Sequence, residues 1–510
     1  MKKTASILFP ALLFLTACAE NQSSESEVPN EEREENTDKS LTLLFSFGSD
    51  TLDPHLSWVP VRAGVTETLV KVNEDLELEP WLAESWEQVD DQTWEFEIKE
   101  NIPFHNGELL TAQVAAESLE RSIEVNPSLE VALKIEEIQA EGQTLVIHTT
   151  EPHPMLTSEL VNADSGITLT ENEDITERPY GTGPFQVSDF EPNSAVHLTR
   201  FDDYWDGAAN VEEATFTFNN DANVRGMALQ SKEADISYHI PPESLDPIEN
   251  DEDLSIHSVP SVRTHYLVYQ FDNPLLQDQN VRKAIDLLFD RESIVNDIMG
   301  GHADPASGPF HPSFSFGSES EAKHSLEEAE TLLKEDGWEK NEEGLLMKDG
   351  EVLDFTLVTY QARPELPLIA QVLQGEASKI GINMDIRMVE NIDAYLHENE
   401  DWDLATYSVF SAPRGDGGYF LNVSKMPNGA LNPGNTDHKE LNEVIETLNQ
   451  EPNMEKRTEL VKEATSVIQE NNLQSYIIYP YIVVGVNNRV KNWEPGSEEF
   501  YILTNELDVE

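Results

Sequence analysis

Hydrophobic and polar positions along the chain follow two periods, and each period predicts a different kind of element. Alternation with a period of two, as in TWEFEIKENIPF from Trp94 and again over 214–219, predicts half-buried strands. Short apolar runs bounded by turn residues predict further strands. These lie at 41–47, 143–149, 194–201, 353–360, 382–389 and 403–409, and the segment 475–486 predicts a strand pair or one crossing strand.

Apolar residues spaced as on one face of a helix predict the helical segments. These segments are 61–72, 111–123, 281–299, 325–336, 366–381, 438–450 and 454–470. Thr111 is a predicted N-cap, and Gly300 with Gly301, and separately Gly337, are predicted helix stops. The strand–helix–strand order after residue 353 predicts a parallel α/β sheet in the second half of the chain.

The first residues carry a targeting pattern. Lys2 and Lys3 precede ILFPALLFL, an apolar run too short to span a bilayer, and LTAC then ends at Cys18. This pattern resembles the lipobox of bacterial lipoprotein signal peptides, which implies that 1–17 are removed and that Cys18 receives acyl chains such as palmitate. The alternative is an ordinary secretory signal with a chance cysteine. Cys18 is the only cysteine, so no disulfide or thiolate site can form within the chain.

Composition changes sharply near residue 40. Residues 18–40 are polar and acidic, which predicts a disordered tether to the membrane. From residue 41 onward the composition is that of a folded protein, and the remaining length is too great for a single core. We therefore expect at least two lobes.

Charge narrows the classes of partner. The chain has 98 acidic and 32 basic residues, a net charge of −66, and a pI near 4.3. Such a charge argues against binding to nucleic acid and against binding to an anionic lipid surface through basic patches of the protein. It fits an extracellular environment of high salt or high pH, although a generally acidic secreted protein is the alternative. Because the chain has only fourteen arginines, an arginine among glycines or aromatic residues is a candidate functional group.

Several separated motifs occur in a characteristic order. They are LAESWEQVDDQTWEFEIKENIPFHNGELLTAQVAAESL, YGTGPF, RFDDYWDG, QNVRKAIDLLFDRESIV and LLKEDGW. In these motifs, from residue 41 to the C-terminus, the chain resembles the extracytoplasmic solute-binding lipoproteins of peptide and nickel ABC transporters, solute-binding protein family 5. RAGVTETLV, TYQARPELPLIA and APRGDGGYF most resemble the branch that takes up nickel or metal–metallophore complexes.

The resemblance implies an architecture. It is an α/β chain with the two-lobed periplasmic-binding-protein type II fold, in the large form of dipeptide- and nickel-binding proteins, with two hinge crossings. Lobe I would span 41–265 with a C-terminal return at 487–510, lobe II would span 270–484, and the crossings would lie near 265–270 and 481–486. The protein would be a monomer, anchored through Cys18 on the extracytoplasmic face of the membrane, beside an ABC permease and its ATPase.

Three arginines are the leading candidates for the ligand site. Arg414 lies in SAPRGDGGYF after the predicted strand 403–409, where a glycine turn permits a close backbone approach and a guanidinium suits a carboxylate. The alternative is a surface turn in which Arg414 pairs with Asp416. Arg62 lies in WVPVRAG, soon after a loop that borders the cleft in the family, and could instead pair with Glu67. Arg363 follows the strand 353–360.

Further side chains complete the candidate site. Trp58 and His55 share the loop before Arg62, and a structural hydrogen bond is the alternative role for His55. Tyr407 and Phe410 could line the wall beside Arg414 or belong to the core. The last two candidates are amide groups that could equally be ordinary turn residues, Asn432 and Asn435.

Two classes of ligand remain open. The histidines lack close metal-ligand spacing, and 421–436 lacks a histidine that nickel-binding relatives carry there, so we expect no direct metal ligands and no cofactor. The preferred ligand is Ni²⁺, or another transition metal, held inside an organic chelator whose carboxylates meet the arginines. The alternative is an oligopeptide or dipeptide. No nucleophile, phosphate-loop or metalloprotease motif is present, so we do not expect an enzyme.

Overall fold

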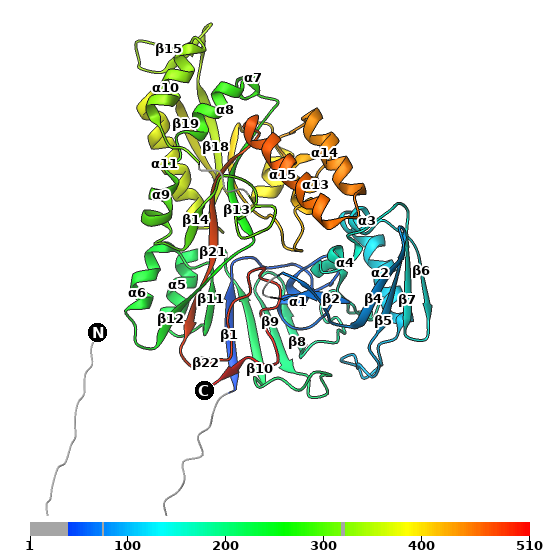
Figure 1. The fold of residues 1–510 in the computed structure, drawn as a ribbon. Coiled ribbons are helices and arrows are strands. Elements are labelled where there is room, and N and C mark those ends of the chain that lie inside the picture. Colours follow the sequence, from blue (N-terminus) through cyan, green and yellow to red (C-terminus); the bar gives the residue numbers. More distant parts are fainter. Residues whose placement is uncertain (1–38, 74–75, 318–321) are drawn as a thin grey trace, which may run out of the picture. The chain divides into compact units, whose positions relative to one another are not determined.

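The computed structural model describes residues 39–73, 76–317 and 322–510. The predicted signal peptide at 1–17, Cys18 and all but the last two residues of the predicted tether lie outside these residues. One compact unit, the body, is formed by Asp38–Glu510 (Figure 1). Among the described residues, none of the helices combines the length and the apolar character needed to cross a bilayer.

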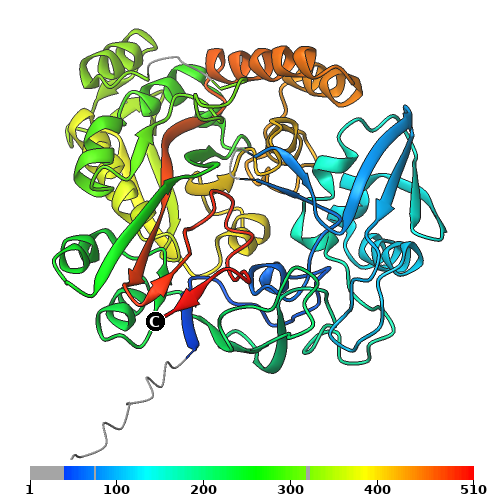
Figure 2. The same ribbon diagram turned by 60° about the horizontal axis from the view of Figure 1, so that its bottom comes forward.

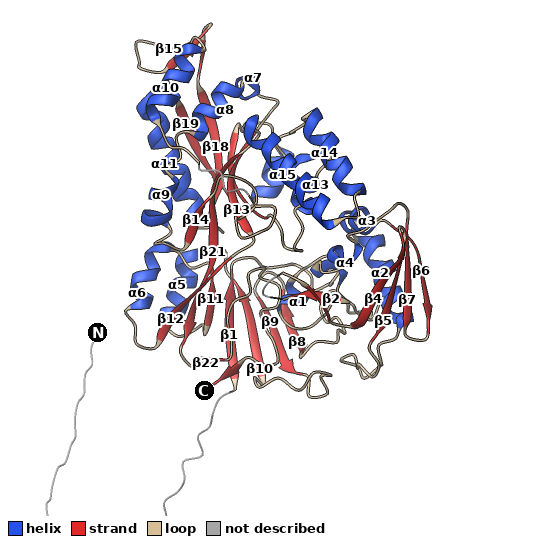
Figure 3. Cartoon of the chain, viewed as in Figure 1, coloured by secondary structure: helices blue, strands red, loops and turns tan. Residues whose placement is uncertain are grey.

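A large mixed sheet runs through the body and determines its organisation (Figure 3). Its main path, in spatial order, is β19 (Asn383–Val389), β18 (Asp354–Tyr360), β20 (Leu404–Phe410), β13 (Arg263–Tyr269), β21 (Ser475–Asn487), β11 (Ile236–Tyr238), β1 (Ser40–Phe45), β10 (Glu213–Phe218), β9 (Ala195–Arg200) and β8 (Phe185–Glu191). Two more strands pair with β21, namely β12 (Leu254–Pro260) and β14 (Ala303–Pro305).

Strand β21 passes from one lobe to the other. Its first half pairs with β13, with His265 opposite Ile478, and its second half pairs with β12, with Pro260 opposite Tyr481. The chain therefore crosses between the lobes twice at adjacent places, once between β12 and β13 and once within β21. Of the two predicted crossing segments, 265–270 covers most of β13 and the residue after it, and 481–486 lies within β21. The predicted two-lobed α/β fold is confirmed, and 475–486 is one crossing strand.

The second lobe is built around the predicted parallel unit. Strand β18 pairs in parallel with both β19 and β20, and Gly381, at φ 94°, ends the helix that connects β18 to β19. Its helices are α7 (Pro274–Gln277), α8 (Gln279–Asp286), α9 (Arg291–Ser293), η3 (Ile294–Ile298), α10 (Leu326–Glu335), α11 (Glu365–Ile380), α12 (Ile392–Glu398), α13 (Gly418–Lys425), α14 (Lys439–Gln450) and α15 (Met454–Glu470). A small sheet joins β15 (Glu339–Lys340), β16 (Leu346–Lys348) and β17 (Glu351–Val352). One hydrophobic core, drawn from 266–479, holds these elements together.

The first lobe adds a four-stranded antiparallel sheet to its half of the large sheet. In spatial order this sheet consists of β4 (Ala83–Asp90), β5 (Thr93–Ile98), β7 (Thr144–Thr149) and β6 (Ile135–Glu141). Helix α2 (Ala112–Val125) packs on β6 and β7, and the Thr111 side chain caps it as predicted by accepting from Val114 N at 3.3 Å. The other helices are α1 (Val59–Arg62), α3 (Pro127–Leu133), α4 (Leu156–Glu159), η1 (Ala163–Ser165), α5 (Ala222–Gln230), η2 (Pro242–Ser244) and α6 (Leu245–Glu249).

The C-terminal segment returns to the first lobe. Two short strand pairs complete this part, β2 (Val70–Val72) with β3 (Leu78–Pro80) and β22 (Val490–Lys491) with β23 (Asp508–Val509). Figure 2 shows the red C-terminal strand beside the blue start of β1, where Lys39 Nζ donates to Asp508 Oδ1 at 2.6 Å. Residues 482–509 contribute to the same hydrophobic core as β1.

One helix prediction was wrong, and a second predicted helix is interrupted. The helix predicted at 61–72 ends at Arg62, because Gly64 has φ +64° and the segment then enters β2. Residues 61–70 are buried on all sides, so their apolar pattern reflects complete enclosure and not one face of a helix. The helix predicted at 281–299 breaks after Asp286 and restarts at Asp290, whose side chain caps Ser293 N.

Candidate functional site

Three arginines from separate parts of the chain meet at one buried residue, Glu499. Arg263 Nη2 lies 3.3 Å and Arg363 Nη2 lies 3.5 Å from Glu499 Oε2. Arg62 Nε donates to the backbone oxygen of the same residue at 3.0 Å. Since Arg62 and Glu499 belong to the first lobe and Arg363 to the second, this cluster joins the two lobes.

Local structure positions each guanidinium against an aromatic ring. Arg62 is the last residue of α1, and its guanidinium carbon lies 4.7 Å from the ring centre of Phe45. Arg263 begins β13, and its guanidinium carbon lies 3.8 Å from the ring centre of Phe410. Arg363 follows β18 within three residues and lies over Phe47 at 5.5 Å. These contacts hold the cations in place without neutralising them.

The protonation states follow from burial and neighbouring charge. Burial alone would raise the pKa of Glu499, but Arg363, His239 and Arg263 hold that pKa well below its usual range. Burial, with Arg363, lowers the pKa of His239 to about 3, so His239 is neutral near pH 7. His239 Nε2 therefore donates to Glu499 Oε1 at 2.8 Å, and its Nδ1 accepts from Ser46 Oγ at 2.7 Å. Burial lowers the pKa of Arg62 only to about 10, so Arg62 remains a cation.

A cavity of about 270 Å³, the arginine cavity, opens between the lobes beside this cluster. Its wall combines the three arginines with aromatic side chains. The lining residues are Phe47, Trp58, Arg62, Arg263, Tyr360, Arg363, Ile392, Asp393, Tyr407, Ser408, Val409, Phe410, Tyr419 and Leu431. Asp393 accepts from the Tyr407 hydroxyl, and Arg263 Nε is buried with no hydrogen-bond partner in the described part of the chain. The cavity thus offers positive charge and a free donor, which suit a compact carboxylate ligand.

Arg414 lies in a second, adjoining cavity of about 420 Å³. Strand β20 leads into the predicted turn, where Gly415 has φ +70°, and the Arg414 guanidinium lies 4.4 Å from the ring centre of Tyr419. Arg414 forms an ion pair with Glu159 of the first lobe, whereas Asp416 pairs with Arg457 at 3.0 Å. The two cavities share three lining residues, which are Trp58, Tyr419 and Leu431.

The remaining sequence candidates separate into two groups. Trp58, Tyr407 and Phe410 line the arginine cavity, and Trp58 stacks on Phe410 with ring centres 6.3 Å apart. His55 lines neither cavity. It is completely buried, with Nδ1 2.6 Å from Arg121 Nη1 and Nε2 3.2 Å from the carbonyl oxygen of Gly166.

The two asparagines also line neither cavity. Asn432 Nδ2 donates to Thr436 O at 2.8 Å and Asn432 Oδ1 accepts from Thr436 N at 2.9 Å, so its side chain closes a turn. Asn435, at φ 55°, donates to Asp272 Oδ2 at 2.6 Å. The Asn432 amide is thus bonded to local backbone and the Asn435 amide to a carboxylate distant in sequence.

Three residues of the site were not predicted from the sequence, namely Arg263, Glu499 and Tyr419. One signal for Arg263 was available, because it is an arginine beside a hydrophobic strand in a chain with few arginines. Glu499 gave no signal among 98 acidic residues. Its importance depends on the C-terminal return, which places it among arginines that lie 136 to 437 residues away in sequence.

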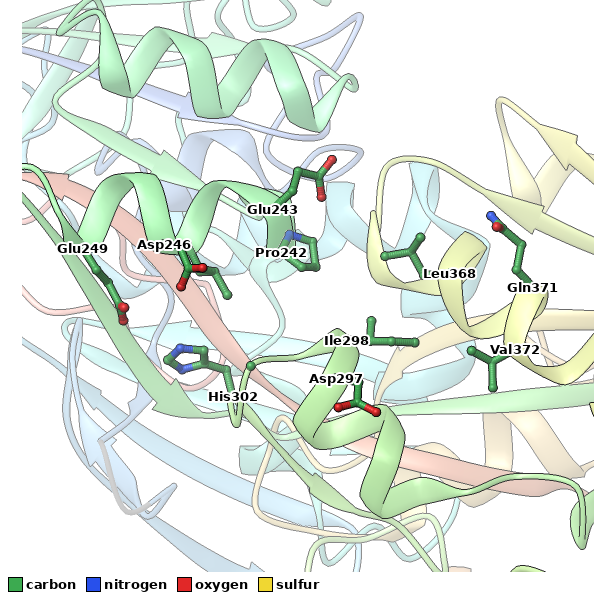
Figure 4. A pocket seen from close by; sticks show the side chains of 12 residues that line it. Pro242, Glu243, Asp246, Glu249, Asp297, Ile298, His302, Leu368, Gln371 and Val372 are labelled. Carbon is green, nitrogen blue, oxygen red and sulfur yellow. The ribbon is translucent and has the colours of Figure 1, made fainter. Parts of the chain in front are cut away.

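A larger cavity, of about 670 Å³, lies between α6 and the segment from η3 to His302 (Figure 4). Four carboxylates line it, those of Glu243, Asp246, Glu249 and Asp297, and its lining contains no lysine or arginine. Its charge is therefore wrong for an anionic ligand, although its volume is greater. Among the described residues, one group of histidine and carboxylate side chains could hold a metal directly, and it lies on β8 and β9 outside both interlobe cavities.

Comparisons with known proteins agree with this two-lobed geometry. Residues 77–430 match the family described as bacterial extracellular solute-binding proteins, family 5 Middle. The nickel-binding protein NikA of Staphylococcus aureus is 32% identical over 510 residues, covering 100% of this chain and 99% of that protein. The oligopeptide-binding protein AppA of Bacillus subtilis is 26% identical over 423 residues, covering 76% and 77% of the two chains.

Two solved structures superpose on most of this chain. The crystal structure of NikA from Staphylococcus aureus in complex with Ni(L-His)2 superposes with a TM-score of 0.86 at 33% identity, covering 92% of this chain and 100% of that chain. The crystal structure of a nickel ABC transporter protein from Bacillus halodurans gives a TM-score of 0.74 at 42% identity, with the same coverage.

Proposed function

The chain belongs to family 5 of the bacterial extracellular solute-binding proteins, and we propose that it is the receptor of an ABC importer for a nickel chelate. The family predicted from the sequence motifs is thereby confirmed. In the proposal, the ligand is Ni²⁺, or another transition metal, bound by small organic molecules that carry carboxylates. The protein binds the chelate between its lobes and releases it to the permease without a catalytic step.

The convergence of Arg62, Arg263 and Arg363 on one residue, Glu499, beside a cavity that all three line is the observation that carries the proposal. Arg263 and Arg363 pair with the Glu499 carboxylate, and Asp393 is, in the described part of the chain, the one carboxylate that lines the arginine cavity of about 270 Å³, so the three guanidiniums outnumber these two carboxylates. Carboxylate groups of a chelate would accept from these donors, including the buried Arg263 Nε that has no partner in the described residues. The rings of Trp58 and Phe410 would pack on the organic part of the ligand.

The resemblance to NikA supports a nickel chelate over other anions. NikA of Staphylococcus aureus was crystallised with Ni(L-His)2, which is a nickel chelate and not a bare ion. A chelate suits the arginine cavity because its lining provides no histidine or cysteine for a bare metal ion. We therefore propose that the protein binds the chelator and that the chelator binds the metal.

A peptide remains the second candidate, because AppA is an oligopeptide-binding relative. A peptide brings an α-ammonium as well as a carboxylate, and it needs room along an extended chain. The two cavities that share Trp58, Tyr419 and Leu431 would have to act as one for this purpose. In that case Arg414 could bind a ligand carboxylate only by exchanging its partner Glu159.

Titration calorimetry of the full-length chain tests the proposal. We expect tight 1:1 binding of Ni²⁺ premixed with L-histidine, and no comparable binding of L-histidine alone or of a mixed peptide library. Arg363→Gln should weaken chelate binding by about 1.5–3 kcal/mol, which is roughly tenfold to a hundredfold. Arg387→Gln is the matched control, because Arg387 pairs with Asp401 on the exterior. Equal affinities of both variants would refute a role for the arginine cavity.

The membrane anchor belongs to the proposal as well. Acylation of Cys18, which lies outside the described residues, would hold the receptor near its permease and ATPase on the outer side of the cell membrane. We propose that a single receptor molecule docks as a monomer and that relative movement of the lobes controls access to the arginine cavity. Metabolic labelling with a palmitate analogue should label the native chain and not Cys18→Ser.

A further inference from the structure

The hairpin of β8 and β9 gathers one histidine and two carboxylates on its outer face. Ligand atoms of Asp189, Glu191 and His197 all lie within 4.8 Å of one another. This proximity depends on an irregularity in β8. The register shifts between Val187 and Asp189, so that Ser188 is left out of the pairing and Asp189 stands opposite His197. Glu191, two residues further, is on the same face as Asp189.

The histidine ring is oriented by its neighbours. His197 Nδ1 lies 3.4 Å from Thr215 Oγ1 on the adjacent strand β10, and His197 Nε2 lies 3.9 Å from Glu191 Oε1. One ring nitrogen is therefore beside a hydroxyl, and the other faces the carboxylates. This is the arrangement of a metal-binding histidine, in which a polar partner at one nitrogen orients the other toward the ion.

The two carboxylates are free to accept a cation. In the described part of the chain, neither Asp189 nor Glu191 forms an ion pair with a lysine or arginine, and Glu191 Oε2 accepts only from Ser194 Oγ at 3.3 Å. An excess of negative charge therefore faces the imidazole. A comparable surface pair, His257 with Glu494 at 2.7 Å, lacks the second carboxylate.

We infer that Asp189, Glu191 and His197 form a divalent metal site on the exterior of the first lobe. One imidazole nitrogen and two carboxylate oxygens suit a borderline ion such as Zn²⁺ or Ni²⁺, with water completing the coordination. The imidazole favours such an ion over Mg²⁺ or Ca²⁺, which prefer oxygen ligands. None of the three residues lines the arginine cavity, so the site binds a bare ion independently of the chelate.

Zn²⁺ titration of the full-length chain tests this site. Calorimetry without histidine or other chelators, in excess Mg²⁺ to occupy carboxylate-only sites, should show one Zn²⁺ bound more tightly than the rest. His197→Gln should weaken that event at least tenfold, and Asp189→Asn should weaken it as well. His257→Gln, the matched control, should give the wild-type curve.

Two results would overturn the inference. Either a His197→Gln curve that superimposes on the wild type, or an equal loss in His257→Gln, would mean that the hairpin does not hold the ion. Binding of Ni²⁺ premixed with L-histidine should be unchanged in His197→Gln. Failure of the surface site and failure of the proposed function are therefore distinguishable, because one is measured with a bare ion and the other with a chelate.

Discussion

Glu499→Gln should destabilise the protein strongly, because Glu499 is the one carboxylate shared by the arginine cluster. Its side chain is 1% exposed and contacts His239, Arg263 and Arg363. Glutamine keeps the shape but removes the charge, which leaves buried guanidiniums without their counter-ion. Removing one partner of a buried pair costs about 3–5 kcal/mol, and we expect a loss of that size in the free energy of unfolding at pH 7.

The same loss should also appear in the pH dependence of the free energy of unfolding. The pKa of Glu499 is held below its usual value in the folded state, so its contribution is present above the unfolded-state pKa. It is lost as the pH falls below that value and through the folded-state pKa. The difference in stability between wild type and Glu499→Gln should therefore be constant near neutral pH and shrink on acidification.

Urea unfolding followed by tryptophan fluorescence measures both effects. Glu498→Gln is a matched control, because Glu498 is also buried but no arginine among the described residues holds its charge. Burial raises the pKa of Glu498, and the Ser497 hydroxyl donates to its Oε2 at 3.3 Å. We expect a small change for the control. A loss of less than about 1 kcal/mol in Glu499→Gln would show that the carboxylate does not hold the cluster together. Adding a carboxylate chelate should stabilise Glu499→Gln more than the wild type, because the ligand supplies the missing charge.

Three further predictions concern other charged groups. Burial without a hydrogen-bond partner in the described residues lowers the pKa of Lys425 well below its usual value, so the unfolded state binds more protons. Between the folded-state pKa and the unfolded-state pKa of about 10, Lys425 should therefore make the free energy of unfolding rise with pH. Lys425→Met should remove about 1.4 kcal/mol per pH unit from that slope, whereas Lys439→Met, at an exposed position, should not. The interlobe pair of Arg414 and Glu159 should show coupling in a double-mutant cycle of chelate affinity, with the double Gln variant losing less than the sum of the single losses. At a net charge of −66, added NaCl should raise the midpoint of thermal unfolding, and calorimetry showing a falling midpoint would contradict screened self-repulsion.

The sequence predicted most of the regular elements because their patterns are local. The cap at Thr111, the stop at Gly337 and the individual strands β18, β19 and β20 follow from signals within a few residues, and the order strand–helix–strand predicts their parallel sheet. The prediction failed at 61–72, where tertiary enclosure buried every face of the segment. It also failed at Asp290, whose side chain begins a new helix inside a continuous apolar pattern.

The candidate site could be predicted only in part, because its geometry is not local. Arg62 and Arg363 were candidates from their positions beside loops and strand ends, and they line one cavity; their role in ligand binding stays a prediction. Arg414 was a candidate for the same reason, yet the fold supplies Glu159 as its partner from the other lobe. No pattern near residue 159 or 499 indicates these partners, since the pairing depends on how the lobes and the C-terminal return are assembled.

Native mass spectrometry of the full-length chain, offered Ni²⁺, L-histidine and a peptide mixture separately and together, is the most direct test of whether the arginine cavity binds a nickel chelate. We expect a bound species with the mass of a nickel–histidine chelate only when metal and histidine are present together, whereas Ni²⁺ alone should add no more than the bare ion at the surface site of Asp189, Glu191 and His197. We also expect that Arg363→Gln loses this species and Arg387→Gln keeps it. A series of bound peptide masses, or a chelate retained equally by both variants, would contradict an arginine cavity that selects a nickel chelate.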